Sequence, residues 1–185
     1  MCKGILPLRF VFGFLESRAI MADRLSDSPA QHPIELVSRF VMQHDWYVRQ
    51  SARNAILADI PGEWSHYQLS VTWQDEAEAL VVICHLDLPY NDACRDALLQ
   101  VSSALNQELW LGHFVYDFDG DRLSLRHTLP LRGAGGATPE QIEDVVDIIL
   151  GESELAYPVL YQVAVGEIAP ADAAKLTLIA HQGEA

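Results

Sequence analysis

The chain has 185 residues, of which half are apolar and 21% are charged, a balance typical of a globular protein. Its 26 acidic residues exceed its 12 basic residues and give a net charge of −14. This charge argues strongly against sequence-independent binding to nucleic acid, because such binding needs lysine and arginine to neutralise phosphates. It also disfavours docking on an anionic membrane surface.

The three cysteines, Cys2, Cys84 and Cys94, have neither a paired spacing nor a metal-ligand spacing. We expect Cys84 in an apolar strand and Cys94 on a helix, each as a buried free thiol. Free thiols fit a reducing compartment. The sequence therefore predicts a cytoplasmic protein, and no motif in it calls for a cofactor.

The first segment does not look like a signal peptide, because Arg9 and Glu16 interrupt its apolar run and no small-residue cleavage site follows. It is also too short and too charged to span a bilayer. Met21 opens a fresh polar segment and would itself make a natural start. We expect residues 1–32 to form a disordered or loosely attached tail, with a membrane or lipoprotein anchor as the less favoured alternative.

The folded part begins with a helix predicted from Pro33 to about Asp45, where apolar side chains recur at helical spacing and Pro33 suits the first turn. Residues 46–48 are ambiguous between helix and strand. A strand is predicted at residues 54–60, and Pro61 stops it.

Two further strands follow. Residues 66–73 alternate between apolar and polar side chains, which indicates one buried face. Residues 79–88 are almost continuously apolar, as in a central strand covered on both faces. Asn91 is then the predicted N-cap of a helix, whose apolar stripe comprises Cys94, Ala97, Leu98, Val101, Ala104 and Leu105.

A β-hairpin is the clearest local prediction, because Asp119-Gly120 separates two alternating runs and an Asp-Gly turn accepts positive φ at both residues. A loop of two or four residues would pair Phe114 with Leu125, Tyr116 with Leu123, His113 with Arg126 and Asp117 with Arg122. One face is then apolar, and the other is polar with a cross-strand ion pair. A three-residue loop would place His113 opposite His127 and mix the faces, so the first register is preferred.

The last elements are helical. Thr138 and Gln141 form a predicted capping box with Pro139 at the first helical position. We expect Gly151 or Pro158 to break or bend this helix, and a short helix to follow at residues 169–180. The predicted order is α-β-β-β-α-β-β-α, which is an α+β domain with an antiparallel sheet.

No catalytic, cofactor-binding or metal-binding residue is predicted. Residues 117–121 superficially resemble a calcium loop, but the glycine and the final glutamate of that motif are misplaced. His113 and His127 point to opposite faces in the preferred register. Residues 133–136 precede a helix but lack the glycine spacing and the lysine of a phosphate-binding loop, so they are interpreted as a flexible linker.

Four tryptophans have distinct positions in the predicted elements. Trp73 is interpreted as a core residue, whereas Trp46, Trp64 and Trp110 lie at element ends. A half-exposed aromatic side chain at such an end can anchor a partner. These three residues form the predicted partner surface, and a structural role for each is the alternative.

Several of these features together resemble the YbjN family: Trp64, residues 80–88, Asn106, the run Leu109-Trp110-Leu111-Gly112-His113-Phe114, the Asp-Gly turn, Arg126-His127-Thr128-Leu129, and Thr138-Pro139-Glu140-Gln141. The resemblance covers roughly residues 33–166 and leaves residues 167–185 as a short C-terminal helix and tail. Proteins of this family are described as bacterial sensory transduction regulators. The resemblance implies a fold like that of type III secretion chaperones, with a twisted antiparallel sheet, helices on one side and usually a dimer. It implies no catalytic residue.

Two functions remain open. The favoured one is a non-enzymatic protein-binding module, which acts as a homodimeric adaptor or chaperone-like regulator in bacterial signalling or stress response with an unidentified protein partner. It predicts an exposed apolar patch. The alternative is a small-molecule-binding protein or an uncharacterised enzyme with a site near His127 and Arg126, with His85 as a further candidate.

Overall fold

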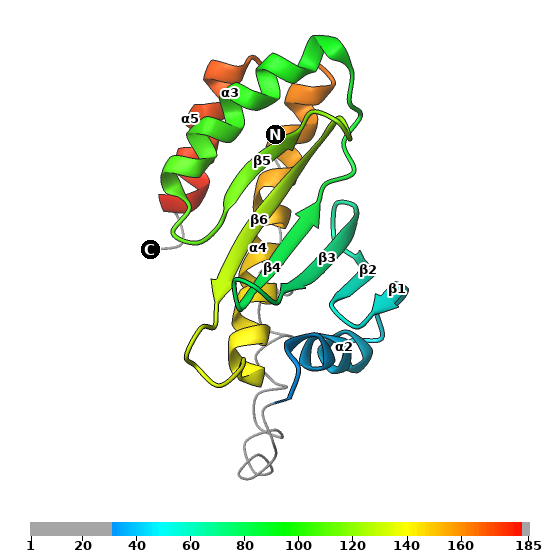
Figure 1. Ribbon diagram of the computed structural model, residues 1–185. Helices are drawn as coiled ribbons and strands as arrows, with labels where there is room; N and C mark the ends of the chain where they lie inside the picture. Colours follow the sequence, from blue (N-terminus) through cyan, green and yellow to red (C-terminus); the bar gives the residue numbers. More distant parts are fainter. Residues whose placement is uncertain (1–30, 183–185) are drawn as a thin grey trace. The chain divides into compact units, whose positions relative to one another are not determined.

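The computed structural model describes the backbone of residues 31–182 and the side chains as far as Leu176 (Figure 1). The tail predicted at residues 1–32 therefore lies outside the described residues, except for its last two positions. In chain order the elements are α2 (Pro33–Gln43), β1 (Tyr47–Ala52), β2 (Ala55–Pro61), β3 (His66–Gln74), β4 (Ala79–His85), α3 (Asp92–Glu108), β5 (His113–Asp117), β6 (Arg122–Pro130), α4 (Pro139–Ala164) and α5 (Pro170–Gln182).

The strands form one six-stranded antiparallel sheet in the order β1-β2-β3-β4-β6-β5. The predicted α+β class is confirmed. The sheet has one strand more than predicted, because β1 includes the ambiguous residues 47 and 48. Five of the six β1 residues are exposed, so the strand lacks the alternation that reveals a half-buried strand in a sequence.

Helices cover one face of the sheet. Helix α2 packs on β2 and β3. Helix α4 packs on β4 and β6 and passes behind these strands in Figure 1. The alternate positions of β3 are buried beneath them, at Tyr67, Leu69 and Val71. The expectation that residues 79–88 form a strand covered on both faces holds only in part, since Ala79 and Val81 on the second face are buried while Ile83 and His85 are half-buried. Strand β4 ends at His85, and among the described residues no helix covers its second face.

The β5–β6 hairpin has the predicted register, since His113 pairs with Arg126 and Asp117 pairs with Arg122. Its loop contains four residues. The predicted turn conformation is wrong, however, because the positive φ of +48° belongs to Asp121 and not to Asp119-Gly120. The Asp121 carboxylate accepts hydrogen bonds from the Tyr116 hydroxyl at 2.5 Å and from the Arg95 guanidinium at 3.0 Å, and these bonds hold the residue in its unusual conformation.

The predicted helix starts are confirmed. Asn91 caps α3 through the Cys94 N–H at 3.0 Å, and Thr138 and Gln141 form the capping box of α4. The expected break at Gly151 or Pro158 is absent, and α4 runs unbroken through both residues. A proline inside a helix costs about 3 kcal/mol. The buried stripe of α4 continues on both sides of Pro158, and this burial offsets the cost.

The chain enters β5 through a close backbone contact. Gly112 has a φ of +80°, and a Cβ atom at this position would lie 3.0 Å from the Arg126 carbonyl oxygen and 3.4 Å from Cδ1 of Ile149. Asn106 of α3 then accepts a hydrogen bond from the Phe114 N–H at 2.6 Å and donates one to the Phe114 carbonyl at 3.0 Å. The side chain of Asn106 thereby occupies the place of a further strand at the β5 edge.

Candidate functional site

The uncovered face of the sheet carries aligned rows of side chains, because directly paired residues of neighbouring strands lie on the same face. One row crosses all six strands and is called the Arg126 row: Gln50, Leu57, Ser70, Ile83, Arg126 and His113. The adjacent row is called the His85 row: Tyr47, Asp59, Gln68, His85, Ser124 and Val115.

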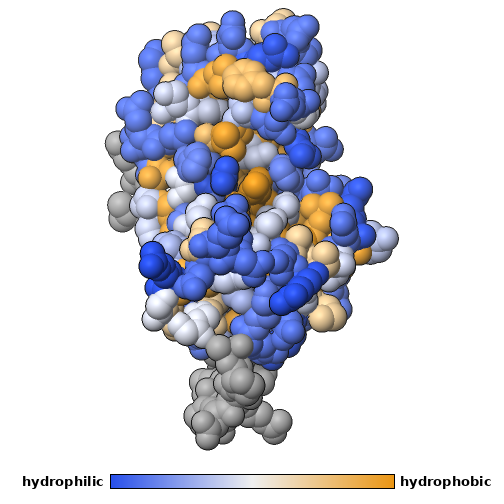
Figure 2. Space-filling view, in the orientation of Figure 1, coloured by the Kyte–Doolittle hydropathy of each residue, from blue (hydrophilic) through white to orange (hydrophobic). Residues whose placement is uncertain are grey.

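Apolar side chains lie in the middle of this face although no helix of the described chain covers it. Leu57, Ile83 and Val115 are half-buried, and Val81 is only 5% exposed. Figure 2 shows apolar groups over the central strands, surrounded by hydrophilic ones. The face therefore carries apolar side chains set among polar ones, since Ser70 separates Leu57 from Ile83 in the Arg126 row.

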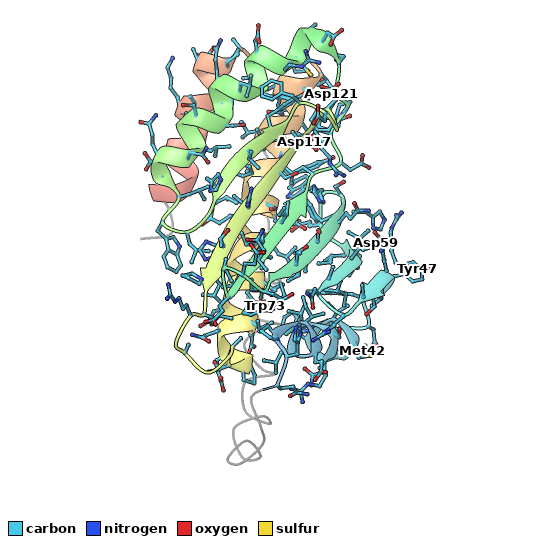
Figure 3. All side chains as sticks on the ribbon, viewed as in Figure 1. Met42, Tyr47, Asp59, Trp73, Asp117 and Asp121 are labelled. Carbon is cyan, nitrogen blue, oxygen red and sulfur yellow. The ribbon has the colours of Figure 1, made fainter. Side chains whose placement is uncertain are left out.

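The carboxylates of this face are ion-paired. Asp59 on β2 accepts from Nε of Arg49 at 2.6 Å, and an oxygen of Asp117 on β5 lies 3.8 Å from Nε of Arg122. Figure 3 shows these two aspartates at separate places on the face. In the part of the chain that the structure describes, Arg126 has no such ion-pair partner. It is half-buried at the centre of the β4–β6–β5 half of the sheet.

His85 and Ser124 are joined by a hydrogen bond of 2.8 Å between Nδ1 and Oγ across strands β4 and β6. Burial, with a further contribution from the Arg122 charge, lowers the pKa of His85 to about 4. The imidazole is therefore neutral at physiological pH. A neutral histidine bonded to a nearly buried serine fixes the position of both side chains on the uncovered face.

The structure does not bring His127 and Arg126 into one site. Arg126 pairs with Ile83 on the uncovered face, whereas His127 pairs with the buried Val82 on the helix-covered face. Burial, and to a lesser extent the nearby His113, lowers the pKa of His127. Of the residues named in the alternative function, Arg126 and His85 share the uncovered face and His127 does not.

The three predicted anchor tryptophans lie in three different connections. Trp46 follows α2 and is half-buried, with its ring edge-on to Phe40 at 5.6 Å. Trp64 lies in the β2–β3 turn and is 49% exposed. Trp110 lies between α3 and β5 and is 74% exposed. Trp64 and Trp110 thus have the exposure that an anchor needs, whereas Trp46 packs against the core.

The family model that matches the chain covers residues 33–162, which is more than half of its length, and carries the description "Putative bacterial sensory transduction regulator". The chain belongs to the YbjN family. A search of curated proteins found no match.

In this YbjN domain, a buried polar cluster lies beneath the helices and is distinct from the uncovered face. Burial raises the pKa of the Cys84 thiol to about 12 and, together with the Glu154 carboxylate, raises the pKa of Tyr67. The Ser153 hydroxyl donates to the Ile149 carbonyl at 2.7 Å, and Glu154 accepts from the Glu63 N–H at 2.8 Å. Glu154 thereby joins α4 to the β2–β3 turn, and burial favours the protonated form of the Cys84 thiol.

A hollow of about 380 Å³ lies beside the start of α2 and the end of β1 of this YbjN protein. Its lining includes His32, Glu35, Ser51 and Arg53, and it includes neither Arg126 nor His127. No group of three or more potential metal ligands occurs among the described residues. Over the same residues, no helix combines the length and the apolar character that crossing a bilayer requires.

The members of the Arg126 row in β2 and β4 were not predicted as functional residues. Ile83 stands in a continuous apolar run, so the sequence does not separate it from its buried neighbours Val82 and Cys84. The sequence did contain one signal for these residues, because strand β4 has more apolar residues than one covered face requires. They lie on both faces of the strand, while the described helices cover only one. An apolar residue on an uncovered face indicates an interaction surface.

Proposed function

We propose that this YbjN-family chain is a non-enzymatic regulator that acts in the cytoplasm as a homodimer and binds another polypeptide. Membership of a family described as bacterial sensory transduction regulators supports the regulatory role. The uncovered sheet face carries the proposal. A one-sided antiparallel sheet normally presents polar residues to water, and here Leu57, Ile83 and Val115 interrupt that pattern.

The proposed binding module spans residues 33–166, with residues 1–32 as a tail and residues 167–185 as a C-terminal extension. The antiparallel sheet with helices on one side supports a comparison with type III secretion chaperones, which are dimers that bind polypeptides. An unidentified protein is therefore the proposed partner, and neither nucleic acid nor a membrane is. The exposed Trp64 and Trp110 are proposed as additional anchors outside the sheet face.

A second candidate function is the binding of a small anionic molecule at Arg126. The pair of His85 and Ser124 favours it, because these residues place fixed polar groups two positions from a guanidinium that has no ion-pair partner among the described residues. This function predicts that phosphate or citrate raises the melting temperature of the chain. It also predicts that Arg126→Gln removes that rise. Absence of any rise with the wild-type chain would leave the polypeptide partner as the better proposal.

Affinity capture with matched variants tests the polypeptide-binding function. The tagged chain is used as bait in a lysate of cells that make it naturally, together with Leu57→Lys on the uncovered face and Leu176→Lys on α5. Leu176 is 45% exposed, so both variants add the same charge at a leucine that solvent reaches, one on the sheet and one on a helix. We expect the wild type and Leu176→Lys to recover the same partner, and Leu57→Lys to lose it.

Light scattering on the same three proteins tests the dimer. We expect the wild type to have twice the mass of the chain over a wide concentration range. If Leu57→Lys recovers the partner as well as the wild type does, the uncovered face is not the binding surface. If Leu57→Lys becomes a monomer, that face is the dimer interface, and the partner must bind elsewhere.

A further inference from the structure

We propose that the partner segment that binds the uncovered sheet face is an acidic amphipathic α-helix, whose carboxylate pairs with Arg126. The inference rests on the proposed polypeptide-binding function and specifies the chemistry of the partner. Nothing in the family description assigns a ligand or a residue to this face.

The charges of the face select an acidic partner. The chain as a whole carries 26 acidic and 12 basic residues, yet the two strand aspartates of the face, Asp59 and Asp117, are already paired with arginines. Arg126 is left without an ion-pair partner among the described residues, with His113 directly opposite on β5. Thr128, which is exposed, follows Arg126 along β6 on the same face. These side chains offer donors, so a carboxylate is the complementary group.

The apolar side chains of the face select a segment that also carries apolar residues. Ile83 is directly beside Arg126 in the row. Val115 lies two residues after His113 on β5 and is therefore the next side chain on the same face. Both are half-buried, and a small anion would leave them uncovered. An apolar side chain placed next to a carboxylate on the partner would cover them while the carboxylate reaches the guanidinium. Removal of this surface from water favours binding, and the partly desolvated pair adds specificity.

The geometry of a sheet face selects a helix. The backbone N–H and C=O groups of central strands are used within the sheet, so the face offers only side chains to a partner. A segment lying on it must satisfy its own backbone hydrogen bonds, and an α-helix does so. The Arg126 row crosses six strands, which spans about 24 Å at the usual strand spacing. A helix of about 16 residues has that length.

Selection from a phage-displayed library of random 20-residue peptides tests the proposal with the purified full chain as bait. We expect selected peptides that combine Asp or Glu with apolar residues at helical spacing and that gain helicity on binding. Their dissociation constants are then measured by fluorescence anisotropy with the wild type, Arg126→Gln, Arg126→Glu and the control Arg132→Glu. Arg132 is an exposed residue of the loop before α4, so its reversal changes the net charge equally.

The expected result is a loss of about tenfold or more in affinity with Arg126→Glu, a smaller loss with Arg126→Gln, and no more than a small general weakening with Arg132→Glu. Circular dichroism and melting curves verify that each variant is folded, and Arg126→Gln supplies the test if Arg126→Glu does not fold. The proposal would be overturned if the selected peptides were basic or non-helical, or if no peptide were selected. Equal binding of the peptides to Arg126→Glu and Arg132→Glu would also overturn it. Loss of dimerisation in Arg126→Gln would also overturn it, since the face would then hold a second copy of the chain.

The outcomes separate this inference from the function on which it rests. If Leu57→Lys abolishes capture of the natural partner and Arg126→Glu does not, the polypeptide-binding function stands and the acidic helix is wrong. If neither variant changes capture, the uncovered face is not the binding surface and the acidic helix is wrong. If the wild type captures no partner at all, the polypeptide-binding function is wrong.

Discussion

The two edges of the sheet are protected in different ways. At the β5 edge, the side chain of Asn106 bonds both backbone groups of Phe114, and the backbone of Gly112 lies against the Arg126 carbonyl. At the β1 edge, the described part of the chain adds no such cover, and five of the six residues of β1 are exposed. This edge has instead an irregularity in register at Arg49, whose side chain pairs with Asp59.

This difference indicates that the two edges depend on different interactions to prevent pairing with another chain. An unpaired strand edge is a template for pairing with another chain, and proteins block it either by covering it or by bulges and charges. The β5 edge is closed by contacts with a helix that is nearby in sequence, so its closure contributes to folding stability. At the β1 edge, the charge of Arg49 contributes little to folding stability but opposes pairing of this strand with another chain. Mutations at the β5 edge should therefore change stability most, and mutations at β1 should change association.

The largest expected effect at the β5 edge comes from Gly112→Ala. The new side chain would occupy a positive φ, which costs about 1–2 kcal/mol, and its Cβ would press on a backbone oxygen at 3.0 Å. We expect a total destabilisation of about 3 kcal/mol, measured by urea unfolding. Gly133→Ala is the matched control, because its φ is +77° and a Cβ added there would meet no neighbouring side chain or backbone within 4 Å. Equal losses in the two variants would show that the close approach contributes nothing.

Asn106→Leu should have the second largest effect. Leucine has a similar size but bonds neither the N–H nor the carbonyl of Phe114, and it hinders water from replacing the amide. We expect a loss of about 2 kcal/mol in the free energy of unfolding, and faster hydrogen exchange at the Phe114 amide. The control is Gln107→Leu, which changes the next residue, whose amide bonds only Ser103 of its own helix. A destabilisation in Gln107→Leu as large as in Asn106→Leu would contradict the edge-closing role.

The β5 edge, which is closed by Asn106, was largely predictable from sequence, whereas the open β1 edge was not. The hairpin register follows from alternation in β5 and β6, where one face is apolar and the other polar, so a shift by one residue would expose the core. The helix caps at Asn91 and Thr138 were also predictable, because capping depends on residues close in sequence. Strand β1 has no such local signal, since an exposed edge strand buries no alternating face.

The candidate site was harder to predict for the same reason. The Arg126 row joins residues from six strands, and its alignment depends on the sheet order β1-β2-β3-β4-β6-β5. Hairpin alternation placed Arg126 opposite His113, but it did not place Ile83 beside them. The unpaired state of Arg126 depends on the positions of all the nearby carboxylates. The positive φ of Asp121 was missed because it depends on bonds from Tyr116 and from Arg95 on a separate helix.

Asp121→Asn should change the acid sensitivity of the β5 end. The Tyr116 hydroxyl and the Arg95 guanidinium lower the pKa of Asp121 below its ordinary value. A carboxylate with a lowered folded pKa stabilises the fold above its unfolded pKa, and this contribution is lost as the pH falls through the folded pKa. We expect the wild type to lose stability more steeply than Asp121→Asn as the pH falls below the ordinary pKa of an aspartate, at about 4. Asparagine still tolerates a positive φ.

Asp119→Asn is the control for that titration, because Asp119 is an exposed carboxylate of the same turn. Urea midpoints across this pH range provide the comparison. Identical pH profiles for Asp121→Asn and the wild type would show that the bonds to Asp121 make no difference to stability.

The smallest expected change in stability is at the open edge, in Arg49→Thr. The ion pair with Asp59 is short, at 2.6 Å, but the Arg49 side chain is 55% exposed, so its loss should cost no more than about 1 kcal/mol, and less at high salt. Threonine also favours strand pairing, so removal of the charge should allow association through β1, seen as mass above the wild-type oligomer in light scattering at high concentration. Gln50→Thr is the control, since it adds the same side chain one position away and leaves Arg49 in place. If both variants associate equally, strand propensity and not the arginine governs this edge; if neither does, the register irregularity at Arg49 is sufficient to protect it.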